Sequence, residues 1–506
     1  MSLLGIDIGS SRCKAVAFTA TGDVLAEAVA DYTPQFPGPS MVEMDPDTIW
    51  LAVASAIRSA ARHRRAGDDA VAAIGLSSHG ETFVPVNAQG EPLAPAILNS
   101  DNRAAAEAKW WEDSLGRKHI FEITGLIVHP MYPMPKLQWL RTHQPDLFAS
   151  ASRFVSISDY VLLKLGLQPY LAYPLACRFM AFDVRARRWS DEILSAAGLS
   201  PDKLPIPVPA GAIAGRLPRT IAADLGLPPD TPVVVGGHDQ PCGALGMGAL
   251  LPGMVTDSIG TYECLVAVQP HPTLDDDALA ASLNSYCHVV PDHYITIAYF
   301  PSGIMTKWFC DNFCAEDAAQ ARAAGQDLHH YLEQRLPASP TGLCILPHLI
   351  GSANPHFDPR ATGVIYGLRQ TTDRFHIYKG ILEGLACELA IISDLLAAVV
   401  GPFAAIRATG GGARSPLGLQ LRASLTGRHF LTLQTSESVC LGAALLAGAS
   451  AGVYSSLEQA VALAVRVAHT VPPDPDLAQS YASQLQQYRL LYPALAPLRR
   501  LPLDTT

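Results

Sequence analysis

Cysteine is scarce in this sequence, and charge of either sign is never concentrated. Only 10 of the 506 residues are cysteine, and the one close pair, Cys310 and Cys314, lacks a second pair or a nearby histidine to complete a zinc site. We therefore expect the reduced thiols of a cytoplasmic protein. Lys and Arg number 36 against 46 Asp and Glu, a net charge of −10, which argues against a nucleic-acid or membrane partner.

Long uninterrupted apolar segments are also missing. The N-terminal residues 1–7 lack the basic and apolar regions of a signal peptide. The longest apolar stretch, residues 380–406, is broken by Glu383, Glu388, Asp394 and Gly401-Pro402, and it predicts a buried helix followed by a turn. With 49% hydrophobic residues, a chain of this length can form more than one core.

The usual phosphate-binding motifs are absent: there is no Gly-Lys-Ser/Thr P-loop and no Gly-x-Gly-x-x-Gly after a strand. The sequence has instead three turns of small residues, whose backbone N–H groups can bind phosphate without a basic side chain. They are Gly9-Ser10-Ser11-Arg12, Gly260-Thr261 and Gly410-Gly411-Gly412. Each alone is compatible with an ordinary turn, but together they favour a nucleotide site.

The pattern around the first turn returns near the midpoint of the chain. Residues 8–13 (Ile-Gly-Ser-Ser-Arg-Cys) and 259–264 (Ile-Gly-Thr-Tyr-Glu-Cys) share an apolar residue, glycine, a hydroxyl residue, two variable residues and cysteine. Alternating helix and strand patterns surround both segments, as is typical of α/β domains. The sequence thus predicts two related α/β domains, residues 1–246 and 247–506.

Two aspartates stand where predicted strands end. Asp7 interrupts an apolar run directly before the first turn, where an unpaired carboxylate is costly to bury and needs a metal, a cation or water. Asp239 follows the strand of residues 233–235 through two glycines, at the strand end where α/β proteins bind ligands. A helix N-cap is an equally good interpretation of Asp239.

These segments together resemble the FGGY family of carbohydrate kinases. Asp7-Ile-Gly-Ser-Ser is similar to the family's first phosphate motif, residues 236–240 (Gly-Gly-His-Asp-Gln) to its catalytic-aspartate motif, and residues 259–261 to its second phosphate motif. Residues 410–415 resemble the adenosine-binding turn. Residues 363–383 resemble the long family signature, and they differ from it at Gly380, where the family usually has Ala or Ser. The resemblance runs from about residue 3 to about residue 450.

The resemblance implies an α/β fold of two actin-like (ribonuclease-H-like) domains with a cleft for ATP and a small sugar between them. It implies that Asp239 is the general base and that Asp7 and Asp239 help to hold Mg²⁺. The implied ATP-binding residues are Gly9, Ser10, Ser11, Arg12, Gly260, Thr261, Gly303, Gly411, Gly412 and Ser415. A homodimer is compatible with the sequence. An actin-like ATPase and a non-catalytic sugar-binding regulator are the alternatives from other classes.

The implied substrate-binding residues are His79, Gly80, Glu81, Asp101, Asp239 and Gln240. His79-Gly80 resembles the xylulokinase motif, although a packed or capping histidine is an alternative, and Asp101 could equally cap a helix. Glu81 lies near the place where glycerol kinases have an Arg-Glu pair, but no arginine precedes it here.

Residues 129–140 and 154–160 look more like the gluconokinase branch. There Lys136 or Arg178 could meet a substrate carboxylate, or each could be a surface cation. The expected substrate is a ketopentose such as D-xylulose, with gluconate or a polyol as the alternative.

Overall fold

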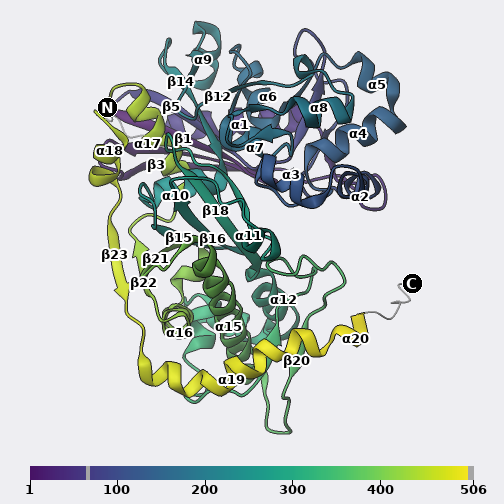
Figure 1. Ribbon diagram of the computed structural model, residues 1–506. Helices are drawn as coiled ribbons and strands as arrows, with labels where there is room; N and C mark the ends of the chain where they lie inside the picture. The colour runs from purple at the N-terminus through teal and green to yellow at the C-terminus, as the bar shows by residue number, and fades with distance from the viewer. Residues whose placement is uncertain (64–68, 500–506) are drawn as a thin grey trace.

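The computed structural model describes residues 1–63 and 69–499, which form two sheet-centred domains (Figure 1). The first domain is built on a six-stranded sheet of order β13-β14-β5-β1-β2-β3. Its strands are β1 (Ser2–Ile8), β2 (Arg12–Thr19), β3 (Val24–Asp31), β5 (Val71–Ser78), β13 (Ile213–Arg216) and β14 (Pro232–His238). Strands β1 to β3 are antiparallel, whereas β1, β5 and β14 are parallel, so the carboxyl ends of those three strands meet at one edge.

The second domain has a seven-stranded sheet of order β17-β18-β16-β15-β21-β22-β23. Its strands are β15 (Val255–Ile259), β16 (Tyr262–Gln269), β17 (Asn284–Cys287), β18 (Tyr294–Pro301), β21 (Ala405–Thr409), β22 (His429–Leu433) and β23 (Val467–Val471). The run β18-β16-β15-β21-β22 repeats the order and directions of β3-β2-β1-β5-β14. The prediction of two related α/β domains is therefore confirmed, while their exact limits stay a prediction.

The two hairpins differ in the register of their strands, although the residue patterns of the two segments match position by position. In the first hairpin Ile8 pairs with Cys13, but in the second Ile259 pairs with Glu263. The second turn is thus one residue shorter, and Cys264 does not occupy the register position of Cys13. Two sequences can share a spacing of residue types and still pair with a different register, because the turn length sets the register.

Smaller sheets and helices surround the two large sheets. The remaining strands are β4 (Glu43–Met44), β6 (Phe83–Val86), β7 (Ala96–Ile97), β8 (Arg153–Ser156), β9 (Tyr170–Ala172), β10 (Phe182–Asp183), β11 (Arg188–Trp189), β12 (Ile206–Val208), β19 (Cys344–Leu346) and β20 (Val364–Tyr366). The first-domain helices are α1 (Pro46–His63), α2 (Ala105–Ser114), α3 (Arg117–Thr124), α4 (Pro133–His143), α5 (Pro145–Ser150), α6 (Ile157–Lys164), α7 (Tyr173–Cys177), α8 (Asp191–Ala197), α9 (Arg219–Leu225) and α10 (Asp239–Gly246). The later helices are α11 (Asp276–Ala280), α12 (Gly303–Phe313), α13 (Ala315–Ala323), α14 (Leu328–Glu333), α15 (Arg374–Val400), α16 (Pro416–Thr426), α17 (Ser438–Ser450), α18 (Leu457–Ala464), α19 (Pro475–Ala494) and α20 (Ala496–Arg499).

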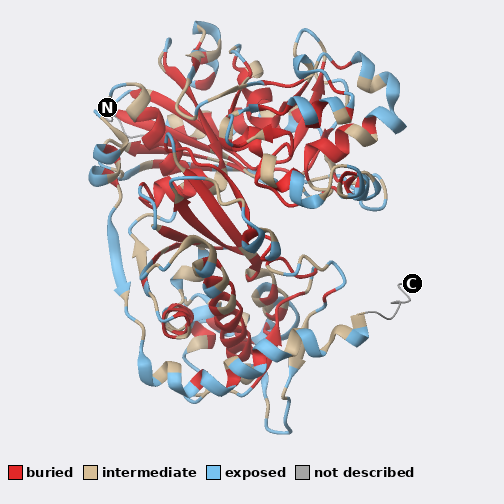
Figure 2. Ribbon diagram, viewed as in Figure 1, coloured by how far each residue is buried: buried red, intermediate tan, exposed pale blue. Residues whose placement is uncertain are grey.

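Buried residues follow both sheets and the helices that cover them (Figure 2). The apolar stretch of residues 380–406 forms most of α15 and leads through a short connection into β21, as predicted. Of its charged residues, Glu383 and Glu388 are buried and hydrogen bonded to tyrosines of α19. Over residues 1–63 and 69–499, no helix has both the length and the apolar composition that crossing a membrane would need.

The two domains are joined by helices that cross each other. Helix α17 comes from the second half of the chain but packs on β1, β5 and α10 of the first domain (Figure 1). The crossing is so close that a Cβ at Gly246 would lie 1.8 Å from the carbonyl oxygen of Ser438. At Gly442 a Cβ would lie 1.8 Å from the carbonyl oxygen of Cys242. Only glycine lets the two backbones approach in this way.

Candidate active site

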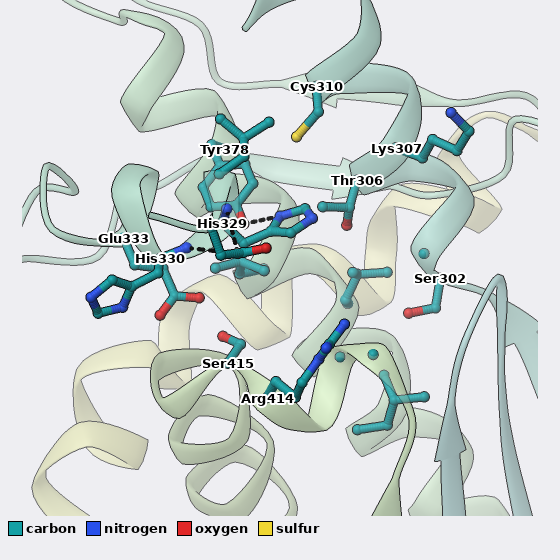
Figure 3. A pocket seen from close by; sticks show the side chains of 18 of the residues that line it. Ser302, Thr306, Lys307, Cys310, His329, His330, Glu333, Tyr378, Arg414 and Ser415 are labelled. Carbon is teal, nitrogen blue, oxygen red and sulfur yellow. Dashed lines mark hydrogen bonds between the residues drawn. The ribbon is translucent and has the colours of Figure 1, made fainter. Parts of the chain in front are cut away.

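A pocket of about 620 Å³ opens in the second domain, and residues from five separate segments line it (Figure 3). Five of the residues predicted to bind ATP are among its lining residues: Gly260, Gly303, Gly411, Gly412 and Ser415. Nearly 160 positions separate the first of them from the last, so the fold alone brings them together. The size of the pocket is in the range of small-molecule and cofactor sites.

Close contacts explain why glycine occupies two of these positions, 303 and 412. A Cβ at Gly303 would lie 2.5 Å from the carbonyl oxygen of Gly260, and a Cβ at Gly412 would lie 2.3 Å from Cγ2 of Ile259. Ser415 caps α16 by accepting a hydrogen bond of 2.8 Å from the Gly418 N–H. The turn from β21 into α16 is thereby held against the end of β15.

The sequence reasoning missed the opposite wall of this pocket. It is formed by α12, α14 and α15 and includes Thr306, Lys307, Cys310, His329, His330, Glu333 and Tyr378. His329 Nδ1 lies 2.9 Å from the Tyr378 hydroxyl, which fixes the imidazole (Figure 3). Tyr378 lies inside the segment recognised as a family signature, but residues 306–333 carry no motif that indicates a site.

One lining residue, Arg422, belongs to a buried ion pair. Arg422 lines the pocket and donates from Nε and Nη2 to the two carboxylate oxygens of Glu263, at 2.8 and 2.6 Å. Ser302, which precedes Gly303, donates to the same carboxylate at 2.8 Å. The pair thus ties the end of β18 and the start of α16 to β16.

The first-domain turn predicted to approach phosphate lies outside this pocket. Gly9 donates its N–H to the carbonyl of Arg12 at 2.9 Å, and the carbonyl of Gly9 accepts from the Tyr32 hydroxyl at 2.5 Å. Ser10, Ser11 and Arg12 are exposed at the tip of the hairpin, as is Thr261 at the tip of the second hairpin. Their predicted role toward phosphate stays a prediction.

Asp7 lies close enough to Asp239 for its charge to raise the pKa of Asp239. The pKa of Asp239 is raised to about 8, first by burial and then by the carboxylates of Asp7 and Glu81, while the Gln240 N–H and the Arg178 guanidinium offset part of the increase. Burial raises the pKa of Asp7 to about 6 against the opposing effect of Lys14. One oxygen of each aspartate, Oδ1, is buried without a hydrogen-bond partner among the described residues.

Asp239 begins α10, directly after β14, and its side chain is 26% exposed. His238 Nε2 lies 3.2 Å from Asp239 Oδ1, but not in hydrogen-bonding geometry. Burial, with the Arg178 charge, lowers the pKa of His238 well below its usual value, so the ring is neutral. Gln240, the next residue, lies 3.5 Å from the Ser258 hydroxyl, two residues before Gly260.

Glu81 forms a buried ion pair that the sequence did not reveal. No arginine precedes Glu81, yet Arg178, from the end of α7, donates its Nε–H to the Glu81 carboxylate. The guanidinium carbon lies 5.1 Å from the Tyr132 ring centroid and 5.0 Å from that of Tyr286. An arginine from a distant segment thus pairs with Glu81.

The other predicted substrate-binding residues are engaged within the protein. His79 uses both ring nitrogens, with Nδ1 2.9 Å from the Ile8 carbonyl and Nε2 2.7 Å from the Thr82 hydroxyl. Asp101 is fully buried, pairs with Arg103 at 2.7 Å and accepts from the Val42 N–H at 2.6 Å. These contacts suit residues that hold the strand ends in place, and their predicted contact with substrate stays a prediction.

Lys136 is not a surface cation, and neither is Arg178. Lys136 is fully buried and donates to the Leu98 carbonyl at 2.6 Å. Burial lowers its pKa to about 7, although the carboxylates of Asp101 and Glu81 act in the opposite direction. Both cations therefore belong to the interior beside Glu81.

Comparison with known proteins identifies the class of protein that this fold and site define. The model of the N-terminal domain of the FGGY family of carbohydrate kinases matches residues 2–246, and that of the C-terminal domain matches residues 256–451. The chain belongs to the FGGY family of carbohydrate kinases. It is an ATP-dependent phosphotransferase, which decides against the actin-like ATPase and the non-catalytic regulator.

The relatives of this chain include kinases named for two different substrates, gluconate and xylulose. The chain is 29% identical to the gluconokinase of Bacillus licheniformis over 486 residues, which cover 95% of this chain and 93% of the relative. It is also 29% identical to the xylulose kinase of Escherichia coli (strain K12) over 498 residues, which cover 98% and 99%.

Among solved structures, the ligand-bound xylulose kinase and the gluconate kinase from Lactobacillus acidophilus each give a TM-score of 0.88 at 23% identity, covering 98% of both chains. These structures confirm the two-domain fold.

Proposed function

We propose that this kinase transfers the γ-phosphoryl group of ATP to a hydroxyl of a ketopentose such as D-xylulose. One observation carries the proposal: glycine turns from three separate segments line one pocket, while Asp239, Glu81 and Arg178 gather where α10 begins. The contact between Gln240 and Ser258 connects the two groups of residues. Identity to the xylulose kinase of Escherichia coli supports the choice of sugar.

Gluconate is the second candidate acceptor. The identity to the gluconokinase of Bacillus licheniformis supports it, as do the two buried cations Arg178 and Lys136 beside Glu81. A neutral ketose carries no charge that would balance either cation, whereas an aldonate carries a carboxylate that an arginine can bind.

In the proposed reaction, Asp239 accepts the proton of the attacking hydroxyl. It directly follows β14, at the carboxyl edge of the sheet, where α/β proteins bind their ligands. A base must be ionised to act, and neutral pH lies just below the pKa of about 8 of Asp239. A substrate-bound cation nearby would favour the ionised form. Phosphoryl transfer otherwise depends mostly on positioning and charge neutralisation.

The acidic pair of Asp7 and Asp239 fits the proposed Mg²⁺. Each aspartate has a buried oxygen without a hydrogen-bond partner, and two neighbouring carboxylates without a cation repel each other. In the described part of the chain, no group of three or more His, Cys, Asp or Glu residues is arranged to hold a metal. This suits Mg²⁺, which keeps water and phosphate oxygens as most of its ligands and would neutralise phosphate charge.

We also propose a cytoplasmic location, because all ten cysteines are free thiols and a reducing compartment keeps them so. A homodimer, with which the sequence is compatible, is not tested by the structure of one chain.

The acceptor is tested by ADP release from Mg-ATP with D-xylulose, L-xylulose, D-ribulose, L-ribulose, glycerol, erythritol and gluconate. We expect strong turnover with one ketopentose and none in the Asp239→Ala variant. Turnover with gluconate alone would favour the second candidate. Silence with every acceptor, while the protein binds ATP, would refute both.

A further inference from the structure

Arg178 has a hydrogen-bonding capacity that the protein leaves unused. Its side chain is 7% exposed, its Nε–H is given to Glu81, and its Nη1 is buried without a partner among the described residues. A guanidinium nitrogen without an acceptor in the interior is unfavourable, because it has lost its hydrogen bonds to water. An acceptor atom supplied by a ligand would remove this cost.

The partner of Arg178 is held in an unusual backbone conformation. Glu81 is buried and has φ of 64°, in the left-handed region that non-glycine residues rarely adopt. Such strained residues cluster at binding and catalytic sites, because the surrounding structure must enforce them. The preceding Gly80 leaves room for the pair, since a Cβ there would lie 3.1 Å from Arg178 Cγ and 3.1 Å from Cδ2 of His238.

The pair also lies within electrostatic range of the proposed base. The charges of both Glu81 and Arg178 act on Asp239, in opposite directions. The rings of Tyr132 and Tyr286 hold the guanidinium from the first and the second domain respectively. An acceptor whose hydroxyl meets Asp239 would therefore present its neighbouring oxygens to Arg178 and Glu81.

We propose that Arg178 and Glu81 select acceptors that carry a carbonyl or carboxylate oxygen next to a hydroxyl. This inference rests on the proposed kinase function and narrows its substrate class. Arginine can only donate and an ionised glutamate can only accept, so Nη1 takes the carbonyl or carboxylate oxygen and Glu81 takes the neighbouring hydroxyl. Both a 2-ketose and an aldonate present this pair of groups, whereas a polyol presents hydroxyls alone.

The experiment compares matched acceptors that differ only in the oxygen that Nη1 would bind. D-xylulose is paired with xylitol, its reduced form, and gluconate is paired with D-glucitol. We expect kcat/KM of the wild-type enzyme to favour the unreduced member of at least one pair by about tenfold or more, as for one hydrogen bond to a charged group. The pair that shows the preference identifies the source of the oxygen, ketone or carboxylate.

Variants of Arg178 then test the residue. Arg178→Met should bring the ratio within each pair close to one, mainly by raising the KM for the unreduced member, while the KM for ATP stays unchanged. Arg178→Lys keeps the charge and should restore part of the ratio. Arg187→Met is the control, because Arg187 also pairs with a carboxylate, Asp292, and lies 5.6 Å from a tyrosine ring centroid, that of Tyr294. It should leave the ratio unchanged.

Equal kcat/KM of the wild-type enzyme for both members of each pair would overturn the inference but not the proposed kinase function. This measurement needs no variant. If Arg178→Met lowers kcat/KM by the same factor for both members of a pair, the inference is also overturned. If all four compounds fail to support ADP formation while ATP still binds, the proposed acceptors themselves are wrong, and the inference is refuted with them.

Discussion

Replacing Asp239 with asparagine should lower activity and raise stability at the same time. The carboxylate of Asp239 is the proposed base, and the amide cannot accept the hydroxyl proton. A well-placed base contributes about 10²- to 10⁴-fold, so kcat should fall by about that factor. The pocket in which we propose that ATP binds is lined by other residues, so the affinity for ATP should change little.

The gain in stability follows from the pKa of about 8 that Asp239 has in the folded protein, against 3.8 for the ordinary side chain. The folded state holds the proton more tightly than the unfolded state, so stability from this group is full below pH 3.8 and is lost as the pH rises toward 8. One pKa unit corresponds to about 1.4 kcal/mol, which gives at most about 4 kcal/mol at pH 7. Because the side chain is 26% exposed, we expect roughly 1–3 kcal/mol.

The assay is thermal unfolding of the ligand-free wild type and Asp239→Asn between pH 4 and pH 8, with ADP release and ATP binding measured at pH 7.5. The Tm of the variant should exceed that of the wild type by an amount that grows with pH. Asp146→Asn, at an exposed position of α5, should show no such trend. Normal turnover in Asp239→Asn would remove Asp239 from the role of base, and a Tm difference that is constant with pH would refute the assigned pKa.

Three further predictions concern the pocket of the second domain, the helix crossing and the pH dependence of activity. Gly412→Ala should raise the KM for ATP about tenfold or more, because the new Cβ would lie 2.3 Å from Ile259 Cγ2, whereas Gly411→Ala, with its nearest atom at 4.0 Å, should not. Gly246→Ala should lower the Tm by an amount that reflects about 1–3 kcal/mol of overpacking, while Gly243→Ala on the same helix, where the nearest atom is 3.4 Å away, should be neutral or stabilising. The wild-type kcat/KM should rise by up to about tenfold per pH unit below pH 8, because more Asp239 is ionised, and a flat profile from pH 6 to pH 8 would contradict this.

The sequence by itself determined the parts of this protein that depend on local patterns. The turns at Gly260 and Gly412 and the strand-end position of Asp239 could be recognised because a few neighbouring residues specify a strand, a glycine turn and a helix start. The repeat of the first hairpin in the second half of the chain was likewise visible, and it predicted two domains of one topology. Its register was not visible, because a turn shorter by one residue leaves the residue pattern unchanged.

Only the tertiary structure decided which distant residues meet. Glu81 and Arg178 are 97 positions apart, and no rule of sequence spacing pairs them; the packing of α7 against the end of β14 brings them together. The wall that α12 and α14 give to the proposed ATP pocket, around His329, is likewise formed by residues that carry no motif. A buried charge needs a partner within a few ångströms, but that partner can come from any segment that folds nearby. The residues next to the charge in the sequence therefore do not show which segment provides it.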